Sequence, residues 1–145
     1  MKIEKRIASP EHYSDRRRDR IMYIVVQGIN NKCTPHYHIT DGKAIQIVPD
    51  DYMSNSVNGG KLNYRGTLHG ICTKFNSISI GVNDTMTDED ITMCLKLIMT
   101  LKQRYKVDKK NIIRQMDITG EASPSVWYNC DKWESDIIKN LIDIS

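Results

Sequence analysis

The chain has 145 residues, of which 39% are hydrophobic and 27% charged, and its formal net charge at pH 7 is +3. This length suits one domain with one core over residues 1–145, and the charge is too small to indicate a nucleic-acid partner. No apolar run approaches the roughly 20 residues that a membrane-spanning helix needs, so we expect no membrane segment.

Positive charge is concentrated in one short stretch, DRRRDR at 15–20. Its two aspartates dilute the field of the arginines, which favours a solvated turn; a patch for phosphate or an anionic wall polymer is the alternative. The four cysteines form no CxxC pair and lie far apart in the sequence. We therefore predict reduced thiols rather than a zinc knuckle or a disulfide framework.

The first half of the chain predicts strands and a long loop. The continuous apolar run IMYIVV at 21–26 is typical of a strand covered on both faces. HYHI and KAIQIVP then form a predicted hairpin with its turn at Asp41-Gly42, and Pro49 ends the second strand. Residues 50–75 predict a long loop. NSISIGV at 76–82 alternates Ile and Val with Ser and Gly, which predicts a half-buried strand.

The second half predicts two helices around one more strand. A helix is expected to begin at Thr87, with Asp90 completing an approximate capping box. Its buried stripe should hold Ile91, Cys94, Leu95, Ile98 and Leu101. NIIRQMDI at 111–118 predicts a short strand. Residues 130–145 predict a terminal helix whose inward side chains are Trp133, Ile137, Ile138 and Leu141. The chain is thus expected to be α/β, with a central sheet flanked by helices.

Five segments, in this order, resemble the zinc-dependent N-acetylmuramoyl-L-alanine amidases, particularly the catalytic domains of clostridial-type phage endolysins. They are MKIEKRIASPEHY, MYIVVQ, PHYHITDGKAIQIVPDD, NSISIGV and IIRQMDITGEASP, and the resemblance covers nearly the whole chain. The last segment, with its Met-Asp-Ile-Thr-Gly core, is the most specific. The resemblance implies a single domain with a mixed, mostly parallel sheet, as in peptidoglycan-recognition proteins. It also implies zinc, held by two histidines and a cysteine, acting on the amide between the lactyl group of N-acetylmuramic acid and L-alanine.

The residues that would hold this zinc are replaced. Gln27 and Gln115 stand where the family has its two histidines, and Ser123 stands where it has the cysteine. Neutral amide and hydroxyl groups bind transition metals poorly. Gly81 replaces a glutamate that serves the catalytic water, and Glu121 replaces a lysine that would steady the oxyanion. We therefore predict that both zinc and hydrolysis have been lost, leaving no cofactor.

Other positions could still form a ligand groove. Asn55 stands in the place of a histidine of the family's substrate loop, and Tyr64 and Arg65 lie in the same loop. With Gln27, Gln115 and Ser123 they are our candidate groove residues. Pro35 stands where some members carry a catalytic tyrosine, and the preceding segment GINNKCTP is shortened to a turn. Trp127 and Tyr128 could stack on a sugar or pack the C-terminal segment onto the domain.

A replacement metal site is the one remaining route to metal chemistry. His36 and His38 are two residues apart on a predicted strand, so their side chains would share a face. A third ligand, His69 or a carboxylate, would have to come from the loop. The alternative is that both histidines pack or hydrogen-bond within the protein.

Three function hypotheses follow. The first is a catalytically inactive amidase-fold protein, a pseudoenzyme of prophage or bacterial origin that binds peptidoglycan, a muropeptide or a protein partner. The second is an active N-acetylmuramoyl-L-alanine amidase with an atypical metal site, and the third is a scaffold or regulatory protein without peptidoglycan affinity. The N-terminus MKIEKRIASP lacks the apolar stretch of a signal peptide. We thus expect a protein that is cytoplasmic as synthesised and is exported, if at all, by a phage-type or other non-classical route.

Overall fold

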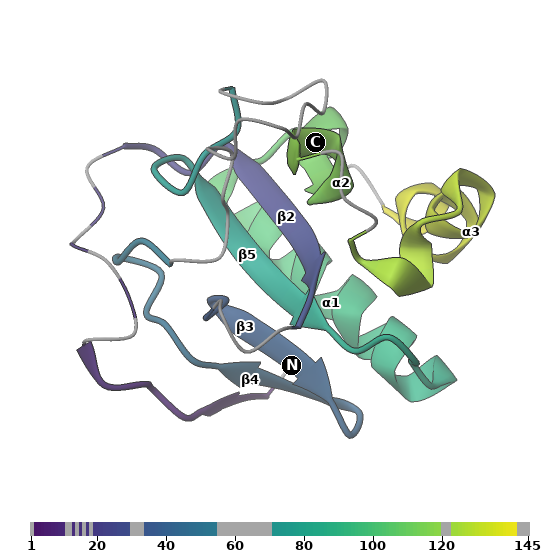
Figure 1. The fold of residues 1–145 in the computed structure, drawn as a ribbon, viewed down its shortest axis with the longest axis horizontal. Coiled ribbons are helices and arrows are strands. Elements are labelled where there is room, and N and C mark those ends of the chain that lie inside the picture. Colours follow the sequence, from purple (N-terminus) through teal and green to yellow (C-terminus); the bar gives the residue numbers. More distant parts are fainter. Residues whose placement is uncertain are drawn as a thin grey trace.

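A six-stranded sheet forms the centre of the computed structural model, which describes residues 2–10, 13, 15, 17, 19–29, 34–54, 71–119 and 123–141 (Figure 1). The strands lie in the order β1-β4-β3-β5-β2-β6. They are β1 (Ile3–Lys5), β2 (Tyr23–Gly28), β3 (Tyr37–Thr40), β4 (Lys43–Gln46), β5 (Ser77–Val82) and β6 (Ile112–Arg114). β3 and β4 pair antiparallel and the other neighbours pair parallel, so the predicted mixed, mostly parallel sheet is confirmed.

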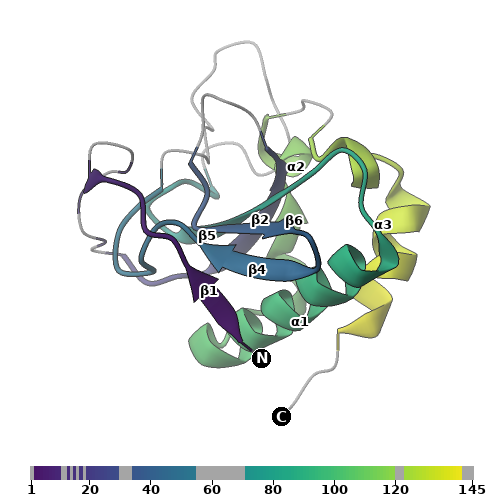
Figure 2. The ribbon, with the colours of Figure 1, turned by 90° about the horizontal axis from the view of Figure 1, so that it is seen from below.

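Different elements cover the two faces of this sheet (Figure 2). The helices are α1 (Asp88–Tyr105), α2 (Met116–Thr119) and α3 (Cys130–Asp136), with 3₁₀ turns at Lys109–Asn111, Ser125–Trp127 and Ile138–Asn140. α1 and the C-terminal segment share one apolar cluster with Ile24 and Val26 of β2. α2 joins the smaller cluster on the opposite face, where Ile118 packs with Val25. Within the described residues, no helix is both long and apolar enough to cross a membrane.

The predicted hairpin turn and the start of α1 are confirmed, and they contact each other, whereas the second strand of the hairpin ends at Gln46 rather than at Pro49. Asp41 and Gly42 both have positive φ, 52° and 67°, as a two-residue hairpin turn requires. The Thr87 hydroxyl accepts the Asp90 N–H at 3.1 Å, and the Asp90 carboxylate accepts the Thr87 N–H at 3.2 Å. The same carboxylate accepts the Gly42 N–H at 2.8 Å, so it joins the helix start to the hairpin. The buried stripe of α1 contains Leu97 in place of the predicted Ile91 and Leu95, which are partly buried.

The strand predicted at 76–82 is present as β5, but the prediction that it is half-buried is wrong, because all six residues of β5 are buried. Its serines hydrogen-bond within the protein, Ser77 to the nearby Thr73 carbonyl and Ser79 to groups from distant segments. The Ser79 hydroxyl lies 2.9 Å from the Ser54 hydroxyl and accepts the His36 N–H at 3.1 Å. Alternation therefore correctly separated the two faces, but a covering segment that hydrogen-bonds to serine is not visible in the strand itself.

The extents predicted for the last strand and the terminal helix are also wrong. β6 ends at Arg114, because Asp117 accepts the Arg114 N–H at 3.0 Å and residues Met116–Thr119 turn into α2. α3 ends at Asp136 rather than continuing to 145, and Asn140 donates to the Ser135 carbonyl at 2.8 Å just beyond it. Residues 142–145 lie outside the described residues.

The predicted solvated turn at 15–20 is wrong for Arg17, whose side chain points into the protein. Its guanidinium donates to the carbonyls of Asp50 and Ser77 at 3.0 and 2.9 Å. Burial lowers the pKa of this guanidinium, although it remains a cation. Arg17 thus ties the N-terminal segment to the start of β5 and to the segment after β4. β1, which was not predicted, forms the edge of the sheet beside β4.

Candidate functional site

Three strands bring together the positions predicted to have lost their metal and catalytic groups. Gln27 is the last residue but one of β2 and pairs with Gly81 of β5. Gln115 directly follows β6, and its N–H donates to the Val26 carbonyl at 2.9 Å. Because Val26 packs on the α1 face, strand alternation places Gln27 on the opposite face, at the carboxyl end of the sheet. In parallel sheets this edge is where ligands usually bind.

Ser123 completes this group, which we call the replaced centre: Gln27, Gln115 and Ser123. The Ser123 hydroxyl accepts the Gly28 N–H at 3.0 Å and donates to Gln115 Oε1 at 3.0 Å. The Ser123 carbonyl also accepts the Met116 N–H at 2.9 Å. The three positions that the resemblance placed in one site are therefore close in space, and Gln115 and Ser123 are bonded to each other.

Gln27 is the buried member of the replaced centre. Gln27 is 1% exposed, whereas Gln115 and Ser123 are partly exposed. Its Oε1 atom is buried and accepts no hydrogen bond from any described residue. A buried acceptor without a donor costs about 1–3 kcal/mol, so this atom is the most unusual feature of the centre.

The replaced centre does not fit a zinc ion. It offers no imidazole and no thiolate, and the Ser123 hydroxyl and Gln115 Oε1 already bond to each other. Among the described ranges, no three His, Cys, Asp or Glu side chains gather into a group that could hold a metal. Burial raises the pKa of the Cys72 thiol to about 12 and also raises that of Cys94, so neither is a thiolate at neutral pH.

The position of the family glutamate is filled by apolar side chains. A Cβ atom built on Gly81 would lie 2.2 Å from Ile29 Cδ1 and 2.9 Å from Pro35 Cγ. Contacts this short require at least one of the two side chains to move. Pro35 was noted in the sequence, whereas Ile29 gave no sign of its role because its contact with Gly81 arises only in the folded sheet.

His36 and His38 bond to separate partners within the protein. The Ser79 N–H donates to His36 Nδ1 at 3.1 Å, so the opposite nitrogen carries the proton and donates to the Tyr52 carbonyl at 2.7 Å. Burial lowers the pKa of His36 to about 4. His38 Nε2 lies 3.0 Å from Asn83 Oδ1. His36 lies just before β3, and neither histidine is brought to the replaced centre by a contact that the structure describes.

Several predicted residues lie outside the described residues, namely Asn55, Tyr64, Arg65, His69 and Glu121. Trp127 is fully buried and packs on Trp133 with ring centroids 5.4 Å apart, which agrees with the packing interpretation. Its Nε1 donates to Asp136 at 2.9 Å. Tyr128 is exposed.

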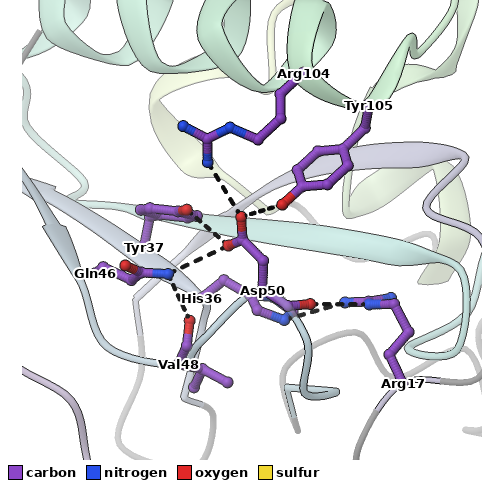
Figure 3. Close-up of polar contacts among 8 residues, drawn as sticks. All are labelled: Arg17, His36, Tyr37, Gln46, Val48, Asp50, Arg104 and Tyr105. Atoms are coloured by element: carbon purple, nitrogen blue, oxygen red, sulfur yellow. Dashed lines mark hydrogen bonds and ion pairs between the residues drawn. The ribbon is translucent and has the colours of Figure 1, made fainter.

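A second polar cluster, which the sequence analysis did not single out, surrounds Asp50 (Figure 3). Its carboxylate accepts hydrogen bonds from Tyr37 at 2.7 Å, from Tyr105 and from Gln46 at 3.3 Å, and it pairs with Arg104 at 3.3 Å. Burial raises the pKa of Tyr105 to about 12 and raises that of Tyr37 as well, so both hydroxyls stay protonated and donate. This cluster joins the last turn of α1 to the β3–β4 pair.

Comparison with solved structures places this architecture among known proteins. The chain matches no protein-family model, and no curated protein matches it. PlyL shares 17% identity and a TM-score of 0.76, with all of both chains covered. A mutant endolysin from Bacillus subtilis shares 17% identity and a TM-score of 0.73, covering 93% of this chain and 96% of that one.

An N-acetylmuramoyl-L-alanine amidase, LysC from Clostridium intestinale URNW, shares 14% identity and a TM-score of 0.67, covering 98% of this chain and 99% of that one. These identities are low, but the alignments run along nearly the full length of both chains, as the resemblance in the sequence predicted. The chain therefore has the fold of endolysins and N-acetylmuramoyl-L-alanine amidases.

Proposed function

We propose that this protein is a non-catalytic member of the amidase fold that binds a cell-wall peptide fragment without cleaving it. The observation that carries the proposal is the bond between Ser123 and Gln115, because two of the three positions expected to hold a metal hold each other instead. The packing of Ile29 and Pro35 over Gly81 supports it, since a side chain at that position would have to displace one of them. Without a metal and a carboxylate, neither the carbonyl nor the attacking water would be activated.

Metal analysis and a hydrolysis assay on the same preparation test this proposal. We expect far less than one zinc per chain after dialysis against zinc and then against metal-free buffer. We also expect no release of L-alanyl peptides from purified muropeptides. Stoichiometric zinc together with peptide release would overturn the proposal in favour of an active amidase with an atypical metal site, which the shared fold favours.

Binding is tested separately by cosedimentation with purified cell-wall sacculi. We expect the protein to pellet with the sacculi and to be displaced by soluble muropeptides. A protein that stays in the supernatant would instead support the scaffold or regulatory hypothesis, in which the fold serves a protein partner.

A further inference from the structure

We propose that a cavity at the amino end of β3, which we call the edge cavity, binds a small zwitterion of the size of a dipeptide. The edge cavity has a volume of about 340 Å³, and its walls come from β1, the β3–β4 pair, the segment after β4 and the last turn of α1. It lies on the face that α1 covers, whereas the replaced centre lies on the other face, at the carboxyl end of β2. The inference therefore does not depend on the proposed function.

Strand pairing builds one wall of the edge cavity. Lys5 of β1 pairs with Gln46 of β4, and Gln46 pairs with Tyr37 of β3. Residues that pair directly across strands project to the same face, so these three side chains form one row. Tyr37 packs in the apolar cluster beneath α1, so the row faces that helix, whose last turn brings Arg104 and Tyr105 to the edge cavity.

Asp50 holds the walls together and has its own acceptor sites filled. Its Oδ1 atom accepts hydrogen bonds from Tyr37 and Gln46, and its Oδ2 atom accepts them from Tyr105 and Arg104 (Figure 3). A carboxylate offers about four lone-pair sites, and these four donors use them. Arg104 contacts Asp50 through Nη1, and its side chain is 47% exposed, so other N–H groups of this guanidinium can reach a second anion.

Lys5 and Asp51 supply opposite charges on the walls of the same cavity. Both residues are exposed, and neither forms an ion pair with another described residue. Opposite charges that line one cavity without pairing leave space between them for a molecule that satisfies both. A ligand carboxylate near Lys5 and Arg104, and a ligand ammonium near Asp51, would each gain the attraction of an exposed ion pair.

The balance of charge favours a zwitterion over a simple ion. Lys5 and Arg104 are cationic and Asp50 and Asp51 are anionic, so the lining carries no net charge. A simple anion would be attracted by the two cations but repelled by Asp51, and a simple cation would meet the opposite difficulty. The volume is at the lower end of the range for small-molecule sites, which suits a ligand of one or two amino-acid residues.

NMR titration with three matched probes tests the inference. The probes are L-alanyl-L-alanine, its N-acetyl derivative, which lacks the ammonium, and its amide, which lacks the carboxylate. We expect the free dipeptide to shift the backbone amide signals of Lys5, Gln46 and Asp51 in a saturable way. It should bind about fivefold more tightly than either derivative, the upper scale of an exposed ion pair.

Variants that remove one charge assign each end of the ligand. Asp51→Asn should bind the dipeptide about fivefold more weakly and should no longer distinguish it from the N-acetyl derivative. Lys5→Met should keep that distinction but lose most of the preference for the dipeptide over its amide. Lys43→Met, which changes an exposed lysine of β4 outside the edge cavity, should bind all three probes as the wild type does. Because Lys5 and Asp51 are exposed, both variants should unfold at the wild-type temperature without ligand, which separates recognition from folding.

Three results would each overturn the inference: no saturable shifts at the edge cavity, equal affinities of the wild type for the three probes, or unchanged affinities in both Lys5→Met and Asp51→Asn. Zinc binding or hydrolysis at the replaced centre would overturn the proposed function and leave these expectations unchanged.

Discussion

His36 is buried as a neutral imidazole, and this neutrality couples the stability of the fold to pH. Its pKa falls from about 6.5 in the unfolded chain to about 4 in the folded protein. Between these values the unfolded state binds a proton that the folded state excludes. The contribution of His36 is therefore complete above pH 6.5 and is lost as the pH falls towards 4, by roughly 3 kcal/mol in all.

Urea denaturation at pH 7 and pH 4.5 measures this effect. His36→Gln should lower the free energy of unfolding at pH 7, yet it should lose less stability than the wild type when the pH is reduced. Other titrating groups are common to both proteins and cancel in the comparison. Equal losses in the two proteins would show that His36 does not sense pH.

At the residue scale, the place of a residue within its motif predicted which side chains lie near one another. Gln27, Gln115 and Ser123 were singled out by their places in the motifs, and the fold brings them together. The contact between Ile29 and Gly81 could not be found in this way, because it depends on how the segment after β2 turns back over β5.

Asp50 illustrates the element scale, because one carboxylate holds the end of α1 against the β3–β4 pair. Asp50→Ala would leave the hydroxyls of buried Tyr37 and partly buried Tyr105 without their acceptor, and hydrogen bonds to a charged group are individually strong. We expect a loss of about 3 kcal/mol in the free energy of unfolding. The measurement is chemical denaturation, with Asp51→Ala, an exposed neighbour, as the matched control.

Asp51→Ala should change stability by less than about 0.5 kcal/mol, as surface substitutions usually do. If both variants lost the same small free energy of unfolding, the Asp50 cluster would contribute no more to stability than a solvated surface network. Amide hydrogen exchange adds a local readout, since Asp50→Ala should increase exchange in the last turn of α1 more than in its first turn.

Whole elements could be predicted where their determinants are local. The Asp41-Gly42 turn and the cap at Thr87 each depend on a few adjacent residues, and both predictions are confirmed. The burial of β5 was predicted wrongly because the partners of its Ser79 hydroxyl, His36 and Ser54, lie far away in the sequence. β1 is short and lies at the edge, so its burial pattern carries little periodic information.

At the scale of the molecule, the chain has the fold of amidases, and the proposed loss of the reaction centre can be tested by reversing the substitutions. Substituting Gln27→His, Gln115→His and Ser123→Cys supplies the missing metal donors. We expect this triple variant to retain zinc after dialysis but to leave muropeptides intact. The metal content of the wild type is the baseline for this comparison.

Turnover should require the catalytic positions as well, and the structure adds a condition that the sequence alone did not reveal. In Gly81→Glu, the new Cβ atom would lie 2.2 Å from Ile29 Cδ1. The variant that adds Gly81→Glu and Glu121→Lys to the three metal-ligand substitutions should therefore be inactive or unfold easily. Adding Ile29→Ala makes room, and the stability loss from Gly81→Glu should then shrink by about 1 kcal/mol or more, since residues in contact are not additive. Chromatography of muropeptide digests provides the activity readout. Equal cleavage with Ile29 intact would mean that packing over Gly81 does not limit hydrolysis by this variant.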